Sequence, residues 1–135
     1  MKNKLSELFY NQELQSSKYL TYLDTYEQLF TPYREKKITF VEIGVKSGGS
    51  LTMWKQYFSK DSRIIGIDTN SDAKILEKYD LEIFIGDQSD ENFWKNFFLE
   101  VGLVDIVLDD GGHINIEQIM TCEMCIPNIN DDGIL

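Results

Sequence analysis

Short apolar runs alternate with amphipathic stretches along most of the chain. Apolar runs rich in β-branched residues, which predict buried strands, lie at residues 38–44, 63–68, 81–87 and 104–110. Stretches with apolar side chains at helical spacing, which predict helices, lie at residues 51–58, 89–102 and 114–126. Apolar strands separated by helices or loops are typical of a mostly parallel sheet covered on both faces. The pattern therefore predicts a doubly wound α/β fold.

A helical pattern also precedes the first predicted strand. Residues 16–33 repeat aromatic side chains at helical spacing, with Ser16 or Ser17 as a cap and Pro32 near the end. We expect residues 1–35 to form a helical segment that packs on a core domain of residues 36–135. Its stripe of tyrosines either lines a substrate pocket or packs against a neighbouring element, and packing is the more common use. The stripe comprises Tyr19, Tyr22, Tyr26 and Tyr33.

Acidic side chains occur at or near the end of every predicted strand. They are Glu42, Asp68, Asp87, Asp109 and Asp110. Buried carboxylates are costly unless they are paired or bound to a cation. In a parallel sheet, the carboxyl ends of the strands meet at one edge, where ligands bind near the switch point of the strand order. We therefore expect these acids to converge on one ligand crevice.

A glycine-rich turn, EIGVKSGGS at residues 42–50, follows the first predicted strand. Glycines let the backbone approach a ligand closely, and the helix that follows offers free N–H groups. The candidate ligand-binding residues of this turn are Glu42, Gly44, Lys46, Gly48 and Ser50. The spacing is not G-x-G-x-x-G, which disfavours a dinucleotide seated on the helix terminus. A tight turn that needs glycine for packing explains the motif equally well.

Three acids beyond the turn are further candidates for holding a cofactor. Asp68, after the second predicted strand, can accept hydrogen bonds from both hydroxyls of a ribose, or it is an exposed turn residue. Asp87 can accept a hydrogen bond from an adenine amino group, or it lies in a turn near a helix cap. Asp109 is the third candidate, because it ends the fourth predicted strand.

The run DDGGH at residues 109–113 contains the only histidine of the chain. Gly111 and Gly112 allow a sharp turn, which would bring Asp110 and His113 into one pocket. The alternative is a capping aspartate and an incidental surface histidine. An apolar strand needs no such ending for stability, so the cluster indicates a functional site.

Composition and charge exclude several classes of function. The 135 residues, 42% hydrophobic and 27% charged, indicate one globular domain with a real core. A net charge of -10 argues against binding nucleic acid, which depends on clustered Lys and Arg. We expect no membrane partner and a cytoplasmic location, because the sequence shows neither a long apolar run nor a signal-peptide core. Cys122 and Cys125 form a lone C-x-x-C, which favours ordinary helix residues over a metal or redox site.

Taken together, the motifs give a family resemblance over residues 19–135. The glycine turn and the acids after the strands resemble those of class I S-adenosylmethionine-dependent methyltransferases, although Lys46 breaks the family pattern E-x-G-x-G-x-G. YLDTYEQLFTPYREKKITFVEIGVKSGGSLTMWKQYF together with DDGGH resembles more closely the metal-dependent sugar O-methyltransferases that modify macrolide antibiotics. The resemblance implies a Rossmann-like fold in which Glu42 and the turn hold the methionine portion of the cofactor. It also implies that Asp110 binds magnesium and that His113 is the base.

The resulting expectation is an O-methyltransferase that uses S-adenosylmethionine and Mg²⁺ to methylate a hydroxyl of a sugar or sugar-containing metabolite. One alternative is an enzyme with a nucleotide or dinucleotide cofactor. Another is a non-catalytic module that binds S-adenosylmethionine or a nucleotide. Metal-dependent product formation separates these possibilities. The sequence names no acceptor and leaves open whether the chain forms a homo-oligomer.

The last residues, Gly133 to Leu135, predict the start of a fifth strand. We therefore expect the domain to be C-terminally incomplete, with an uncovered sheet edge beside the fourth strand. In the family that the chain resembles, a Glu-Asp pair beyond this point supplies further magnesium ligands. With Asp110 as the only mapped ligand, magnesium would be held weakly and the chain alone would not turn over.

Overall fold

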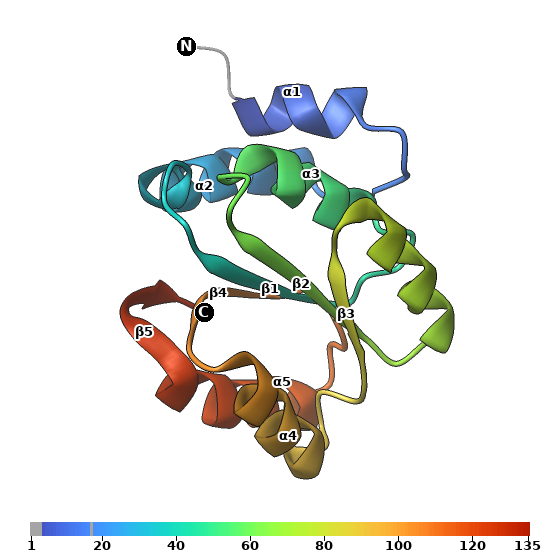
Figure 1. The fold of residues 1–135 in the computed structure, drawn as a ribbon, viewed down its shortest axis with the longest axis vertical. Coiled ribbons are helices and arrows are strands. Elements are labelled where there is room, and N and C mark those ends of the chain that lie inside the picture. Colours follow the sequence, from blue (N-terminus) through green and yellow to red (C-terminus); the bar gives the residue numbers. More distant parts are fainter. Residues whose placement is uncertain (1–3, 17) are drawn as a thin grey trace.

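The computed structural model describes residues 4–16 and 18–135. Five parallel strands form one sheet in the order β3-β2-β1-β4-β5, with helices on both faces (Figure 1). The strands are β1 Thr39–Ile43, β2 Arg63–Asp68, β3 Glu82–Ile85, β4 Val104–Asp109 and β5 Ile129–Ile134. The doubly wound α/β prediction is confirmed, and β1 to β4 lie within two residues of their predicted bounds.

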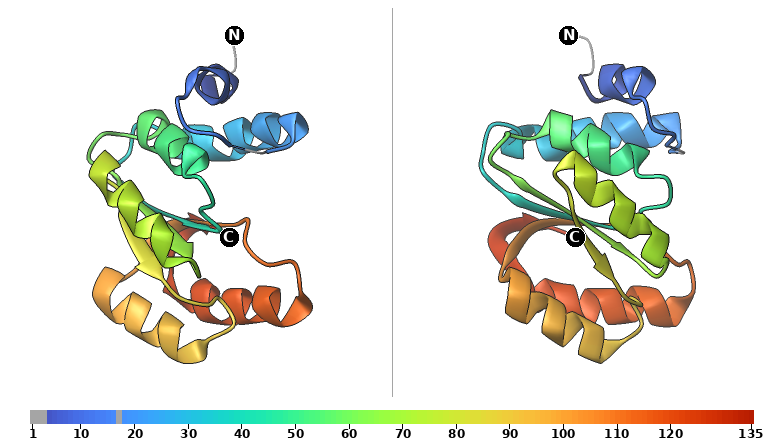
Figure 2. Two further views of the ribbon diagram at one scale, coloured as in Figure 1. Left: turned by 90° about the vertical axis from the view of Figure 1, so that its right-hand side faces the viewer. Right: turned by 45° about the vertical axis from the view of Figure 1, so that its right-hand side comes forward.

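Helices cover the two faces of the sheet in separate layers. The α-helices are α1 Lys4–Asn11, α2 Leu20–Phe30, α3 Gly49–Tyr57, α4 Glu91–Val101 and α5 Asn115–Cys125, and the 3₁₀ segments are η1 Thr31–Tyr33, η2 Ser71–Tyr79 and η3 Ile126–Asn128. Helices α1, α2 and α3 lie on one face, and α4 and α5 on the other (Figure 2). No helix in the described part of the chain is both long and apolar enough to cross a membrane.

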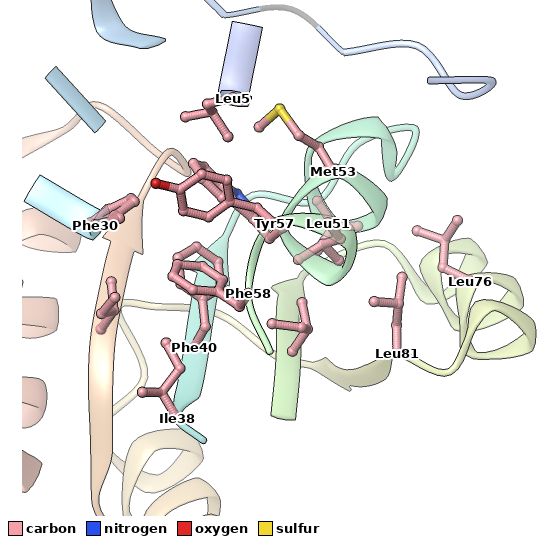
Figure 3. Packing of buried hydrophobic residues seen from close by; sticks show 14 of the residues in the cluster. Leu5, Phe30, Ile38, Phe40, Leu51, Met53, Tyr57, Phe58, Leu76 and Leu81 are labelled. Carbon is pink, nitrogen blue, oxygen red and sulfur yellow. The ribbon is translucent and has the colours of Figure 1, made fainter. Parts of the chain in front are cut away.

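Each face of the sheet has its own hydrophobic core. An aromatic cluster around the fully buried Trp54 joins α2 and α3 to β1, through Phe30, Phe40 and Phe58 (Figure 3). On the opposite face, Trp94 and Phe97 of α4 pack with Val41, Ile65 and Cys125. Fully burying a Phe, Ile or Val side chain stabilises a fold by about 1.5–3 kcal/mol, so both cores hold their helices on the sheet.

Helix α2 differs from its predicted form at both ends. It begins at Leu20, and the N-cap residue Tyr19 makes no side-chain capping hydrogen bond, so the prediction of Ser16 as the cap was wrong. Ser17, the other candidate cap, lies outside the described residues. The helix ends at Phe30, before Pro32, which belongs to the separate 3₁₀ turn η1. It ends there because proline has no N–H to donate inside an α-helix.

The tyrosine stripe packs as predicted only in part, since Tyr26 and Tyr33 pack against the core. The residues of α2 that enter the core are Leu23 and Phe30, whereas Tyr19 is 74% exposed and Tyr22 is 49% exposed. The expectation that the stripe packs against a neighbour was therefore wrong for these two tyrosines.

The fifth strand is longer than predicted and lies beside β4. It begins at Ile129 rather than Gly133, and its pairing with β4 is irregular, with Val104 opposite Ile129 and Ile106 opposite Ile134. The expected open edge beside β4 is therefore covered. The pattern failed because β5 has the sequence INDDGI, whose central Asp131 and Asp132 are exposed and break the apolar run.

The two cysteines lie on α5. Cys122 is exposed and Cys125 is buried, and neither is in a disulfide. Burial raises the pKa of Cys125 to about 12, so its thiol stays protonated at neutral pH and is a poor nucleophile and metal ligand. These features agree with ordinary helix residues.

Candidate active site

The parallel arrangement brings the loops after β1 and β4 into direct contact. The Gly44 N–H donates to the Ile67 carbonyl oxygen at 2.8 Å, and the Asp110 N–H donates to the Ile43 carbonyl oxygen at 3.0 Å. Gly44 has φ of 87°, and a Cβ added there would lie 2.2 Å from the carbonyl oxygen of Asp110. Only glycine allows this approach, so the glycine turn and the DDGGH loop form one unit.

We expect Gly44→Ala to lower the free energy of unfolding by about 2 kcal/mol or more, because left-handed backbone strain adds to a backbone clash. Urea unfolding measures the loss. Gly102→Ala is the control, since φ at Gly102 is also positive but an added Cβ meets no atom within 4 Å. A loss below about 1 kcal/mol for Gly44→Ala would contradict the close approach.

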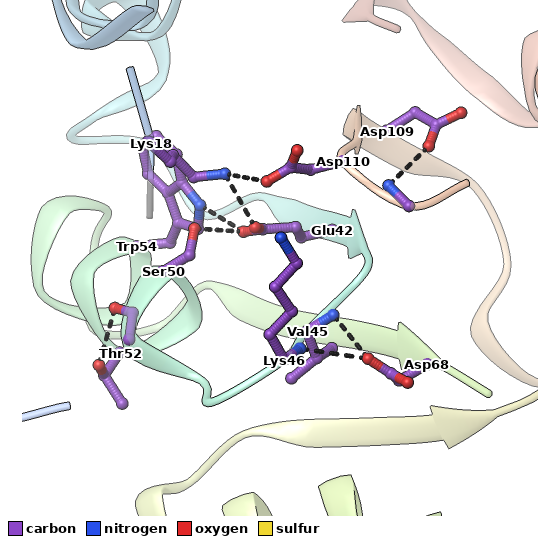
Figure 4. A network of polar contacts seen from close by, with 12 residues as sticks. Lys18, Glu42, Val45, Lys46, Ser50, Thr52, Trp54, Asp68, Asp109 and Asp110 are labelled. Atoms are coloured by element: carbon purple, nitrogen blue, oxygen red, sulfur yellow. Dashed lines mark hydrogen bonds and ion pairs between the residues drawn. The ribbon is translucent and has the colours of Figure 1, made fainter. Parts of the chain in front are cut away.

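A buried lysine connects the two acids beside this contact. Lys18 Nζ lies 2.7 Å from Asp110 Oδ2 and 3.2 Å from Glu42 Oε1. The side chain of Lys18 is 2% exposed, and that of Glu42 is 1% exposed. The other carboxylate oxygen of Glu42 accepts hydrogen bonds from Ser50 Oγ and Trp54 Nε1, each at 2.7 Å (Figure 4). Glu42 is therefore paired on both oxygens, as a buried carboxylate requires.

Opposing effects set the pKa values of this pair. Burial raises the pKa of Glu42 above its usual range, against the lowering effect of the Lys18 charge and of the hydrogen-bond donors. Burial alone would lower the pKa of Lys18, but Glu42 and Asp110 together outweigh burial and raise it. Lys18 is therefore charged at neutral pH. It holds one carboxylate from each side of the Gly44 contact.

Asp68 supports the glycine turn from the end of β2. Its Oδ2 accepts the N–H of Val45 at 2.9 Å and that of Lys46 at 3.2 Å, and its Oδ1 accepts the N–H of Asn70 at 2.9 Å. The residue is half-buried. A carboxylate has about four acceptor positions, so Asp68 retains capacity for a ligand while it orders the turn.

Asp109 is tied to Gln88 within the protein. The buried Gln88 donates from Nε2 to Asp109 Oδ2 at 3.1 Å and to Thr121 Oγ1 at 3.0 Å, while its Oε1 accepts the Gly112 N–H at 2.7 Å. Asp109 Oδ1 also accepts the Gly111 N–H at 3.1 Å. This network fixes the shape of the DDGGH loop. The predicted cofactor contact of Asp109 is not tested by it and stays a prediction.

Three cavities meet at this edge, and Lys46 and Asp110 line all of them. The lysine cavity, about 320 Å³, is lined also by Lys18, Glu42 and Ser50. The aspartate cavity, about 300 Å³, is lined by Asp68, Asp87 and Gly112. The tyrosine cavity, about 460 Å³, is lined by Lys18, Tyr19, Tyr22, Tyr26 and His113.

Most of the predicted site residues line these cavities. They are Glu42, Gly44, Lys46, Ser50, Asp68, Asp87, Asp110 and His113. Gly48 and Asp109 do not line them. Gly48, the N-cap residue of α3, faces the side chain of Leu76. Asp109 faces Gln88. Asp87 is exposed, and hydrogen bonds from Ser89 lower its pKa.

Sequence reasoning missed Lys18 and Gln88. Lys18 contacts Asp110 across 92 positions and Glu42 across 24, and no local motif marks such a contact. Gln88 lies between Asp87 and a helix cap, where a polar residue is unremarkable. Among residues 4–16 and 18–135, no cluster of three or more His, Cys, Asp or Glu side chains is arranged to hold a metal.

Comparison with known proteins identifies the relatives of this arrangement. No family model matches the chain. The chain is 35% identical over 121 residues to the 8-demethyl-8-α-L-rhamnosyl tetracenomycin-C 2'-O-methyltransferase of Streptomyces olivaceus, an alignment that covers 84% of this chain and 32% of that protein. It is 32% identical over 116 residues to the mycinamicin VI 2''-O-methyltransferase of Micromonospora griseorubida, covering 81% of this chain and 29% of that protein.

A solved structure agrees with these relatives. The MycE methyltransferase of the mycinamycin pathway, in complex with Mg and SAH, matches 96% of this chain and 38% of its own, with a TM-score of 0.85 and 30% identity. The chain is therefore similar in sequence and in fold to these methyltransferases. It spans about a third of the length of the curated sugar O-methyltransferases that it matches. The family resemblance and the Rossmann-like methyltransferase fold predicted from the sequence are thus confirmed.

Proposed function

We propose that this protein transfers a methyl group from S-adenosylmethionine to a hydroxyl of a sugar or sugar-containing metabolite. The observation that carries the proposal is the position of Asp110, which lines the tyrosine cavity together with His113 and also lines both neighbouring cavities. An acceptor beside His113 would therefore adjoin a cofactor at the carboxyl edge of the sheet. The sugar O-methyltransferases related to this chain support the same chemistry.

The lining of the lysine and aspartate cavities fits S-adenosylmethionine. This cofactor carries a sulfonium, an ammonium, a ribose with two free hydroxyls and an adenine amino group. Glu42 and the glycine turn line the lysine cavity, while Asp68 and Asp87 line the aspartate cavity. Hydrogen bonds from Ser89 lower the pKa of Asp87, so its carboxylate can accept from the adenine amino group at neutral pH. MycE was solved with SAH, which supports this cofactor.

Asp110 fits a magnesium ion as one of its ligands. Its side chain is 37% exposed, and only its Oδ2 contacts Lys18. Magnesium binds through one or two carboxylates together with water and substrate oxygens, so Asp110 would supply one protein ligand beside the acceptor cavity. A bound magnesium ion would orient the acceptor hydroxyl and lower its pKa.

His113 is suited to take the proton from the acceptor hydroxyl. It is exposed at the loop after β4 and lines the tyrosine cavity with Asp110. A neutral imidazole accepts a proton near neutral pH, which leaves an oxygen nucleophile for the methyl group. The Gly112 N–H donates a hydrogen bond to Gln88 Oε1 and so holds the loop that carries His113. The base therefore keeps its position relative to Asp110.

Calorimetric titration with S-adenosylhomocysteine tests the cofactor site. We expect Asp68→Ala to weaken binding by about 1–3 kcal/mol, since the ribose hydroxyls lose a charge-assisted acceptor. Asp72→Ala is the matched control, because Asp72 is an exposed aspartate in the next turn that lines neither the lysine nor the aspartate cavity. Unchanged affinity in Asp68→Ala would remove Asp68 from the ribose site, and no binding by the wild-type chain would contradict the proposed function.

A further inference from the structure

The tyrosine cavity has an aromatic wall that the fold does not need for packing. Tyr19 and Tyr22 contact each other edge to face, with ring centroids 5.3 Å apart, and both are largely exposed. Tyr22 lies on α2 and Tyr19 is its N-cap residue, whereas the residues of α2 that reach the core are Leu23 and Phe30. Exposed aromatic pairs that line a concave surface are typical of ligand contact.

The inner end of this wall is firmly anchored. Tyr22 contacts Tyr26 with ring centroids 6.1 Å apart, and Tyr26 stacks on the buried Phe30 at 5.6 Å. Tyr26 also meets the ring of Trp54 edge to face at 5.9 Å, and Trp54 donates a hydrogen bond to Glu42. The wall is therefore joined through packed rings to the buried acid of the lysine cavity.

The rest of the tyrosine cavity is polar. Lys18, Lys46, Asp110 and His113 contribute cationic, anionic and imidazole groups to the same cavity. A ligand that suits this lining has one apolar face and several hydroxyl groups. A saccharide ring has that character, since its axial C–H bonds form an apolar face while its hydroxyls point outward.

We propose that Tyr19 and Tyr22 form the acceptor-binding wall, which takes the apolar face of a sugar ring and the apolar group to which the sugar is attached. The outer ring, Tyr19, is the more exposed and meets the attached group, while Tyr22 lies nearer the reacting sugar. This assignment rests on the proposed function, because it places the acceptor beside Asp110 and His113. It makes the two tyrosines determinants of acceptor specificity.

The test compares two neutral probes, methyl α-L-rhamnopyranoside and 4-nitrophenyl α-L-rhamnopyranoside, by calorimetry in the presence of S-adenosylhomocysteine and Mg²⁺. We expect wild-type protein to bind the nitrophenyl glycoside more tightly. Tyr22→Ala should raise the Kd of both probes about tenfold, the loss of one aromatic contact. Tyr19→Ala should raise mainly the Kd of the nitrophenyl glycoside. S-adenosylhomocysteine affinity should stay within about twofold in both variants, because neither tyrosine lines the lysine or aspartate cavity.

Two variants separate ring contact from general disturbance. Tyr22→Phe keeps the ring and should bind both glycosides within about threefold of wild type. Tyr10→Ala removes a comparably exposed tyrosine of α1 outside the tyrosine cavity, and should change nothing. Unchanged glycoside affinity in Tyr22→Ala, or no glycoside binding by a wild-type chain that binds S-adenosylhomocysteine, would overturn the proposal. Absence of S-adenosylhomocysteine binding would overturn the proposed function, and this inference with it.

Discussion

Replacing His113 with alanine is expected to lower methyl-transfer turnover by about a hundredfold or more, the usual cost of losing a general base. The expectation applies to a protein that has the full length of the relatives, because this chain alone is expected to hold magnesium weakly. Cofactor affinity should be nearly unchanged, because His113 lines the tyrosine cavity and neither the lysine nor the aspartate cavity. Single-turnover rates with a glycoside acceptor measure the first effect. Titration with S-adenosylhomocysteine measures the second.

Asn115, two residues after His113, offers a control for this experiment. Asn115 is exposed at the start of α5 and lines none of the three cavities, so Asn115→Ala should retain wild-type turnover. Raising the pH should partly restore turnover in His113→Ala, because hydroxide or buffer can replace a missing base. Equal losses of binding and turnover would show instead that His113 has a structural role.

Lys18→Met is expected to lower the free energy of unfolding by about 3–5 kcal/mol. Removing one partner of a buried ion pair leaves an uncompensated buried charge, and Lys18 is the cation beside both Glu42 and Asp110. Methionine preserves most of the side-chain volume, so the loss is electrostatic in origin. Urea unfolding at neutral pH gives the magnitude.

The pH dependence of this loss has a definite sign. Without Lys18, the pKa of Glu42 rises further, because burial already raises it and the charge that lowers it is gone. A folded pKa above the unfolded value gives stability that is present below the unfolded pKa and is lost as the pH rises through the folded pKa. The difference between Lys18→Met and wild type should therefore be smaller at about pH 4.5 than at about pH 8.

Lys55 provides the matched control, because it pairs at 2.9 Å with Asp80, whose side chain is 89% exposed. Lys55→Met should change the free energy of unfolding by less than about 1 kcal/mol, as expected for an exposed ion pair.

In wild type, the pKa of Lys18 is raised, so its stabilising charge is lost only at a pH above 10.5, the ordinary pKa of lysine. A loss independent of pH between 4.5 and 8 would contradict the assigned charge state of Glu42.

The sheet could be predicted from the sequence because burial on both faces leaves a strong local signal. The runs that became β1 to β4 are apolar at most of their positions. β5 was mostly missed, because its two central aspartates are exposed and an irregular pairing relaxes the demand for apolar residues. No element is predicted from the sequence for residues 71–79, which form the 3₁₀ segment η2.

The site could be predicted only in part, because only some of its residues leave a local signal in the sequence. Acids at strand ends converge because parallel strands share an edge, so Glu42, Asp68 and Asp110 could be grouped without a structure. The partners that neutralise or fix them could not. Lys18 lies in a stretch that the sequence predicts to be helical and Gln88 lies in a loop, and neither position marks a contact with a residue far along the chain. The tyrosines of α2 show the opposite failure, since helical spacing fixes a shared face but does not decide whether that face meets the core or a ligand.

The contact between Lys18 and Asp110 also bears on how the protein folds. It joins residues 92 positions apart, and each strand pairing of the parallel sheet closes a further long loop. Contacts this distant in sequence form slowly, because closing the loop costs chain entropy before the energy of the new contact can offset that loss. The three cavities therefore form only when the segments around β1 to β4 and the start of α2 have come together. A ligand that binds at their junction only in the folded chain would stabilise that chain against partly folded forms by mass action.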